Sequence, residues 1–94
     1  MSHDPVDIVI ADDNAVLLSV LAESLKECGY SVRTAVDGLG ALTEIRNLAP
    51  DILLSDLNMP KMSGFELISI VHRDYPRIKV IAMSGSYSGT IVPE

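Results

Sequence analysis

Acidic residues end two short apolar runs in this sequence. Asp12-Asp13 follows the run from Ile8 to Ala11, and Asp56 ends the run that begins after Asp51. A single Asp after a strand is a common turn or cap residue, so neither segment is specific by itself. If both runs are strands of one parallel sheet, their carboxyl ends lie at the same edge, where open sheets of this kind bind ligands. We therefore expect one shared acidic pocket, with Asp56 exposed at a strand-to-helix turn.

Such a pocket would need a counter-charge, because crowded carboxylates raise one another's pKa values. A hard divalent cation supplies it, and an all-oxygen ligand set without paired His or Cys favours magnesium over zinc. Magnesium held by a few carboxylates is the usual arrangement for phosphoryl transfer. Asp56 would be the attacking carboxylate, which forms an acyl phosphate.

For Asp12-Asp13 alone, helix capping is an equally good explanation. Ser84, after the last apolar run, would lie at the same edge, although alone it is a typical turn residue.

The pattern along the chain predicts the elements that would position these residues. Strands are expected at residues 6–11, 30–36, 52–56 and 78–83. Helices are expected at residues 14–28, 39–48 and 63–75, where apolar residues recur at helical spacing and Gly29, Pro50 or Pro76 follows. Asn14 and Ser63 are the predicted caps of the first and third helices, and Asp37-Gly38 is a predicted turn.

The same spacing predicts which helical residues face the sheet. In the first helix these are Leu17, Leu18, Leu21, Leu25 and Cys28; in the second, Leu39, Leu42, Ile45 and Leu48; in the third, Phe65, Ile68, Val71 and Tyr75. The single Cys28 cannot form an internal disulfide, and we expect it to be a small core residue.

Length and composition bound the fold class and the compartment. Ninety-four residues suit one domain, and the order strand-helix three times followed by a strand predicts an α/β doubly wound parallel sheet over residues 1–94. A net charge of −6 argues against non-specific nucleic-acid binding. No apolar run approaches the ~18 residues of a membrane span, and the first residues lack a signal-peptide pattern, so a cytoplasmic protein is the default expectation.

The arrangement resembles the receiver domains of two-component response regulators. The resemblance covers nearly the whole chain, through Ile10-Ala-Asp-Asp-Asn14, Ala35-Val-Asp-Gly38, Pro50-Asp51, Ser55-Asp-Leu-Asn-Met-Pro-Lys-Met-Ser-Gly64, Phe65-Glu-Leu67 and Ile81-Ala-Met-Ser-Gly85. The stretch from Asp56 to Gly64 is highly specific to that family. The resemblance implies a flavodoxin-like fold and a phosphoprotein in which Asp56 accepts a phosphoryl group from a histidine kinase or phosphotransfer protein. It also implies that Asp12 and Asp13 hold Mg²⁺ with Asp56 and the backbone carbonyl of Asn58, and that Ser84 is a switch hydroxyl.

The sequence also departs from that family. Receiver domains have a fifth strand and helix, with a Lys at the end of that strand, whereas no Lys follows Ser84 here. We therefore expect an incomplete receiver fold, with four strands and a tail at residues 85–94. Phosphorylation should then be slow, since Lys61 is the only cation near Asp56 in the sequence. The alternative function is a signalling-impaired fragment that self-associates through the exposed edge of the strand at 78–83.

Two enzyme classes fit the sequence less well. A haloacid-dehalogenase-like phosphatase needs a second Asp two residues after the nucleophile, where Asn58 stands. A dinucleotide-binding fold needs Gly-x-Gly-x-x-Gly after the first strand, where this chain has Asp12-Asp13-Asn14.

Overall fold

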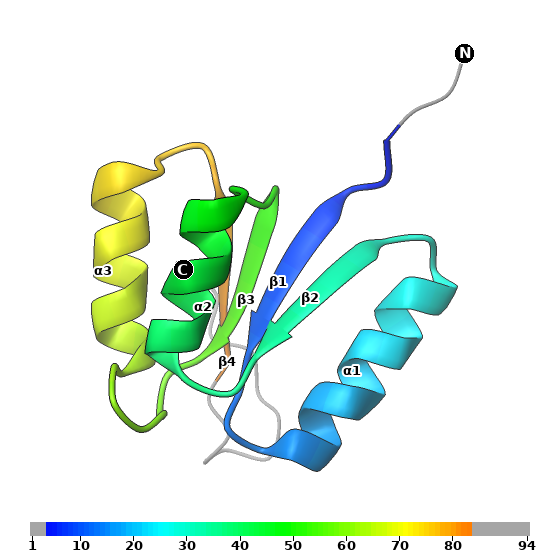
Figure 1. The fold of residues 1–94 in the computed structure, drawn as a ribbon, viewed down its shortest axis with the longest axis horizontal. Coiled ribbons are helices and arrows are strands. Elements are labelled where there is room, and N and C mark those ends of the chain that lie inside the picture. The colour runs from blue at the N-terminus through cyan, green and yellow to red at the C-terminus, as the bar shows by residue number, and fades with distance from the viewer. Residues whose placement is uncertain (1–3, 84–94) are drawn as a thin grey trace.

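The protein folds as a parallel sheet with helices on both faces. The structure, a computed structural model, describes residues 4–83. Its strands are β1 (Asp7–Ala11), β2 (Ser31–Ala35), β3 (Ile52–Asp56) and β4 (Lys79–Met83), which pair in the order β2-β1-β3-β4. The helices that connect them are α1 (Ala15–Glu27), α2 (Gly38–Asn47) and α3 (Gly64–Asp74) (Figure 1). The predicted doubly wound α/β architecture is confirmed.

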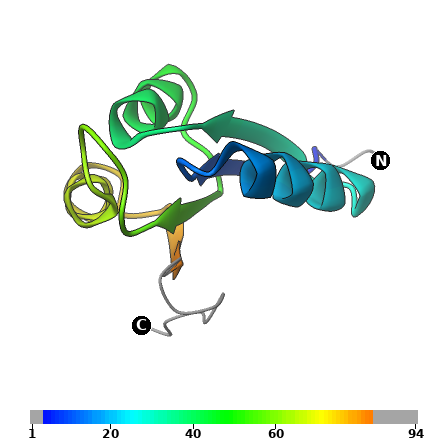
Figure 2. The same ribbon diagram turned by 90° about the horizontal axis from the view of Figure 1, so that it is seen from below.

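Two hydrophobic clusters fill the space between the sheet and its helices. Successive side chains of a strand point to opposite faces, so β1 contributes Val9 and Ala11 to one cluster, and Ile8 and Ile10 to the other. The first cluster lies under α2 and α3, and the second lies under α1, on the opposite face (Figures 1 and 2). Because β1 is buried on both faces, its carboxyl end is a rigid support for the residues that follow it.

The helix starts are fixed by side-chain caps. The Asn14 side chain accepts a hydrogen bond from Leu17 N–H at 3.1 Å. Ser63 and Glu66 form a reciprocal capping box at the start of α3. Both predicted caps are confirmed. Asp37, which the sequence placed in a turn, is the cap of α2 and accepts a hydrogen bond from Gly40 N–H at 2.7 Å.

The buried face of α3 differs from the predicted one at its first turn. Leu67 and Val71 are fully buried, whereas Phe65 is 62% exposed. Each residue advances a helix by about 100°, so a face centred on Leu67 and Val71 turns Phe65 away from the sheet. Ile68 and Tyr75, at the border of that face, are half-buried.

Predicted core residues near the ends of the other helices are exposed as well. Leu17 is 39%, Leu39 is 49% and Leu48 is 63% exposed. Cys28 is also exposed, so its expected place in the core is wrong. Leu17 and Leu39 lie in the first turn of their helices, and Leu48 and Cys28 are C-cap residues.

Arg33 of β2 ties the far end of α2 to the sheet. Its guanidinium donates hydrogen bonds to the carbonyl oxygens of Glu44 and Leu48, at 2.9 and 2.8 Å. It also pairs with the Asp7 carboxylate of β1 at 2.8 Å. One side chain therefore connects β1, β2 and the C-terminal end of α2. No helix within residues 4–83 is long and apolar enough to cross a membrane.

Candidate metal centre

The carboxyl ends of β1 and β3 bring three carboxylates together. Asp12 and Asp13 follow β1 directly, and Asp56 is the last residue of β3. The two strands are paired neighbours, with Ala11 beside Ser55, so the residues after them meet at one edge of the sheet. One carboxylate oxygen from each of the three acids lies within 4.8 Å of the others.

Two of these acids are buried. Asp12 is 3% and Asp56 is 6% exposed, while Asp13 is exposed. The expectation that Asp56 stands exposed is therefore wrong, because Asp56 is still part of β3, an inner strand, and pairs with Met83 of β4. Gly64 lies so close that a Cβ there would overlap the carbonyl oxygen of Asp56. The burial makes each negative charge costly unless it is compensated.

Backbone amides orient the two buried carboxylates. Asn14 N–H donates to Asp12 Oδ1 at 2.8 Å, and Asn58 N–H donates to Asp56 Oδ1 at 3.2 Å. Within residues 4–83, the second oxygen of each carboxylate makes no hydrogen bond. Each buried acid thus has one oxygen that is held in place and one that is available to a ligand.

The electrostatics of the cluster favour a cation. Burial raises the pKa of Asp12, a hydrogen bond from the Asn14 backbone lowers it, and the charges of Asp56 and Asp13 raise it further. The net effect is a pKa above the usual 3.8. In the part of the chain that the structure describes, no Lys or Arg forms an ion pair with any of the three acids. Three oxygen donors with uncompensated charge fit Mg²⁺, a hard cation that prefers oxygen ligands.

Two further residues were predicted to belong to this site. Asn58 lies two residues after Asp56 and is exposed. Its N–H is directed to Asp56, while the metal-binding role of its carbonyl stays a prediction. Ser84 follows β4 in the sequence and lies outside the described residues.

Lys61 and Asp37 form a contact beside the site that the sequence reasoning missed. Lys61 Nζ lies 3.6 Å from Asp37 Oδ2, so the loop after β3 is joined to the start of α2. The Lys61 ammonium is therefore directed to Asp37, and any direct role at Asp56 stays a prediction. The sequence signal for Asp37 was present, since an Asp just before a helix is a typical N-cap.

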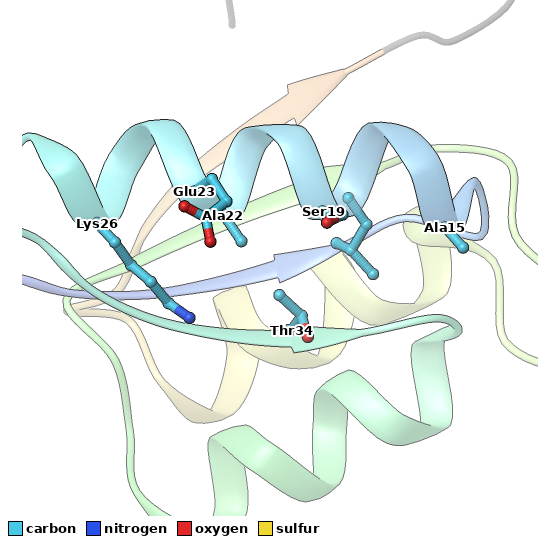
Figure 3. A pocket seen from close by; sticks show the side chains of 7 residues that line it. Ala15, Ser19, Ala22, Glu23, Lys26 and Thr34 are labelled. Atoms are coloured by element: carbon cyan, nitrogen blue, oxygen red, sulfur yellow. The ribbon is translucent and has the colours of Figure 1, made fainter.

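An open cavity of about 310 Å³ lies elsewhere, between α1 and β2. Figure 3 shows Glu23 and Lys26 of α1 beside Thr34 of β2 in its lining. None of the three clustered acids lines it. Within the described residues, the Asp12, Asp13 and Asp56 cluster is the candidate site for a metal ion.

Known proteins with this sequence pattern identify the family. The response regulator receiver domain family matches residues 8–92. The chain belongs to this family. Among the similar proteins that contain such a receiver domain, the nitrogen assimilation regulatory protein NtrX of Azorhizobium caulinodans is 38% identical over 87 residues. The sensor histidine kinase RcsC of Salmonella typhimurium is 42% identical over 66 residues.

The receiver domain is only part of these relatives. The matched region covers 90% of this chain but 18% of NtrX, and 70% of this chain but 7% of RcsC. Solved receiver structures agree with the fold. A CheY-like receiver domain from Methanospirillum hungatei has a TM-score of 0.84 at 31% identity, covering 86% of this chain and 65% of that one. The chemotaxis response regulator CheY4 of Vibrio cholerae has a TM-score of 0.80 at 30% identity, covering 83% and 67%.

Proposed function

We propose that this receiver domain accepts a phosphoryl group on Asp56 in a magnesium-dependent step of a two-component phosphorelay. The observation that carries the proposal is the cluster of Asp12, Asp13 and Asp56 at the carboxyl edge of a receiver fold, with oxygens within 4.8 Å of one another. Such an edge is where open parallel sheets bind their ligands. Buried carboxylates without a cationic partner are suited to hold a metal ion and a phosphoryl group together.

Each residue has a distinct role in this proposal. Asp12 and Asp13 hold Mg²⁺ together with Asp56 and the backbone carbonyl of Asn58. The bound ion supplies positive charge that offsets the phosphoryl oxygens. The Asn58 amide fixes Asp56 Oδ1, which leaves Oδ2 free to attack phosphorus. An O–P bond to Asp56 forms as the N–P bond to the donor's histidine breaks, and the product is an acyl phosphate. On sequence resemblance alone, Ser84 is the hydroxyl that responds to the phosphoryl group.

The proposed phosphodonor is a histidine kinase or a phosphotransfer protein. Support comes from the relatives, which include a sensor histidine kinase and transcriptional regulatory proteins. We also propose that this reaction takes place in the cytoplasm. With a net charge of −6, the chain offers little attraction for nucleic acid, so we propose no direct nucleic-acid contact.

Labelling with a small phosphodonor tests the function. The protein is incubated with phosphoramidate, with and without Mg²⁺, and the bound phosphoryl group is measured by intact-protein mass spectrometry. We expect one acyl phosphate that needs Mg²⁺ and is absent in Asp56→Asn. The matched control is Asp51→Asn, an exposed carboxylate at the other end of β3, which should label normally. Equal labelling of Asp56→Asn and the unaltered protein would refute the assignment.

A further inference from the structure

Lys61 has an unusual backbone conformation beside the metal centre. Among residues 4–83 it is the only non-glycine residue with positive φ, at 68°. A non-glycine residue in this left-handed region costs on the order of 1 kcal/mol or more, and it persists only where its surroundings hold it. The contacts that hold Lys61 should therefore matter for the loop between β3 and α3.

Two contacts hold the middle of that loop. The first is the ion pair between Lys61 Nζ and Asp37 Oδ2, at 3.6 Å. The second is backbone packing, because a Cβ at Gly38 would overlap the carbonyl oxygen of Met62. Adjacent residues on one loop thus meet adjacent residues at the start of α2. Asp37 is fixed in turn, since its other oxygen caps Gly40 N–H at 2.7 Å.

The ends of the loop are held independently by hydrogen bonds. Leu57 N–H donates to the Met83 carbonyl at 3.0 Å, and Gly64 N–H donates to the Leu57 carbonyl at 3.1 Å. Asn58 lies between these fixed ends, close to the acid cluster. Its N–H donates to Asp56 Oδ1 at 3.2 Å, and Lys61 and Met62 follow it in the middle of the loop.

We propose that the ion pair between Lys61 and Asp37 positions the loop after β3 for Mg²⁺ binding, which makes Lys61 a positioning residue of the metal centre. The proposal rests on the proposed function of that centre. Lys61 acts through the loop backbone, because its ammonium is paired with Asp37 and not with the acids. The start of α2 is therefore the support that holds the middle of the loop, and through it Asn58.

Two conservative variants test this. Lys61→Asn removes the ammonium, and Asn accepts positive φ more readily than most residues. Asp37→Asn removes the carboxylate charge and keeps an N-cap oxygen for Gly40 N–H. Mg²⁺ affinity is measured by calorimetric titration at low ionic strength. We expect each variant to bind Mg²⁺ about threefold more weakly, the size usual for an exposed ion pair. The double variant should be no weaker than either single one.

The signs of the two changes in Mg²⁺ affinity distinguish positioning of the loop from a direct electrostatic effect of the two charges on the metal. If the charges acted only through space, removal of a positive charge near three carboxylates would strengthen Mg²⁺ binding, and removal of a negative charge would weaken it. Positioning predicts that both variants bind more weakly. Opposite directions for Lys61→Asn and Asp37→Asn, or unchanged affinity in both, would overturn the proposal.

A second measurement works without metal. In the metal-free protein, amide exchange at Asn58 should be about threefold faster in both variants, while exchange at Leu57 and Gly64, which hold the ends of the loop, should not change. The difference at Asn58 should disappear near ~1 M salt, where surface charges are screened. Arg73→Gln is the control, because it removes an exposed ion pair with Asp74 at the other end of α3. If the unaltered protein does not bind Mg²⁺, the proposed function fails, and the exchange rates alone decide the positioning role. Unchanged exchange at Asn58 in both variants would overturn it.

Discussion

At Asp12, the burial and neighbouring charges that suit a metal ion should lower the stability of the metal-free protein. Asp12 is 3% exposed, and its carboxyl lies beside those of Asp13 and Asp56. Burial, followed by these neighbouring charges, raises its pKa above the usual 3.8, against the opposing effect of the Asn14 amide. A carboxyl whose pKa is higher in the folded protein than in the unfolded chain binds more protons when folded. Without metal, the contribution of Asp12 to stability should therefore fall as the pH rises from 3.8 through its raised pKa in the folded protein.

Asp12→Asn should stabilise the metal-free protein at neutral pH. The amide keeps an oxygen for Asn14 N–H and removes the buried charge, so we expect the free energy of unfolding to rise by about 0.5 to 2 kcal/mol. Urea unfolding at a series of pH values measures it. The gain should shrink toward pH 4, where the Asp12 carboxyl of the unaltered protein is increasingly protonated, and should shrink again when Mg²⁺ is added. A variant that is less stable than the unaltered protein at neutral pH would contradict this account.

Asp13→Ala should weaken Mg²⁺ binding at least about tenfold, because one of few charged ligands is lost. Asp13 is exposed, so the change should leave the free energy of unfolding within about 0.5 kcal/mol. Calorimetric titration measures the affinity, and Asp51→Ala is the control for loss of an exposed carboxylate outside the cluster. Superimposable titration curves for Asp13→Ala and the unaltered protein would remove Asp13 from the metal centre.

At the scale of elements, Arg33 connects two strands and a helix through a single side chain. We expect Arg33→Met, which keeps the apolar stem, to lower the free energy of unfolding by about 2 kcal/mol. The effect should be below that of a fully buried pair, since the Arg33 and Asp7 side chains are 23% and 18% exposed. Within residues 4–83, Asp7 Oδ1 and Arg33 Nε are also buried without a hydrogen-bond partner, which offsets part of the gain. Urea denaturation provides the measurement.

The control for this prediction is Arg73→Met. Arg73 is 71% exposed and pairs with its sequence neighbour Asp74, so its removal should leave the free energy of unfolding nearly unchanged. Equal losses for Arg33→Met and Arg73→Met would show that the contacts of Arg33 with α2 and β1 contribute nothing specific.

The sequence predicted the elements well and the faces of the helices less well. Strand bounds agree within two residues, because β-branched runs and the breakers Gly29, Pro50 and Pro76 are local signals. The buried face of α3 was misassigned because apolar residues occupy more than half of its circumference. The helical spacing of apolar residues alone then cannot distinguish a buried face centred on Leu67 from one that includes Phe65.

Contacts between loops that are far apart in the sequence could not be predicted from it, for a different reason. Parallel pairing follows from the order of elements, so the meeting of the three acids could be anticipated from their places after β1 and β3. The burial of Asp56 depends on the packing of β3 beside β4, and the pairing of Lys61 depends on how the loop after β3 turns. Both are set by packing between segments, for which no local signal exists.

At the scale of the whole molecule, β4 lies at an edge of the sheet, whereas β1 is an inner strand. Within residues 4–83, the outer edge of β4 has no pairing strand. Its residues Val80–Met83 are only half-buried, whereas Ile8–Ala11 of β1 are buried. Lys79 is the one charged residue of β4, and natural edges are usually protected by more charge or by proline.

We predict that the 94-residue chain self-associates through this edge. Sedimentation over a concentration series should show a monomer–dimer equilibrium, and Ile81→Lys should shift it toward monomer by placing a charge in β4. Val20→Lys is the control, since Val20 is 56% exposed on α1, away from β4. A monomer at all concentrations, with slow amide exchange along residues 79–83, would show that the edge is already covered.

The exposed position of Cys28 bears on any such measurement. It is the only Cys of the chain, and it lies at the end of α1 remote from the acid cluster, about 20 Å along the helix axis from Asn14. Air oxidation can therefore join two copies covalently without disturbing the carboxylates. A reducing agent, or Cys28→Ser, is needed before a dimer is attributed to β4. The same thiol gives a single attachment point for a fluorophore, by which Mg²⁺ binding and association can be followed in one sample.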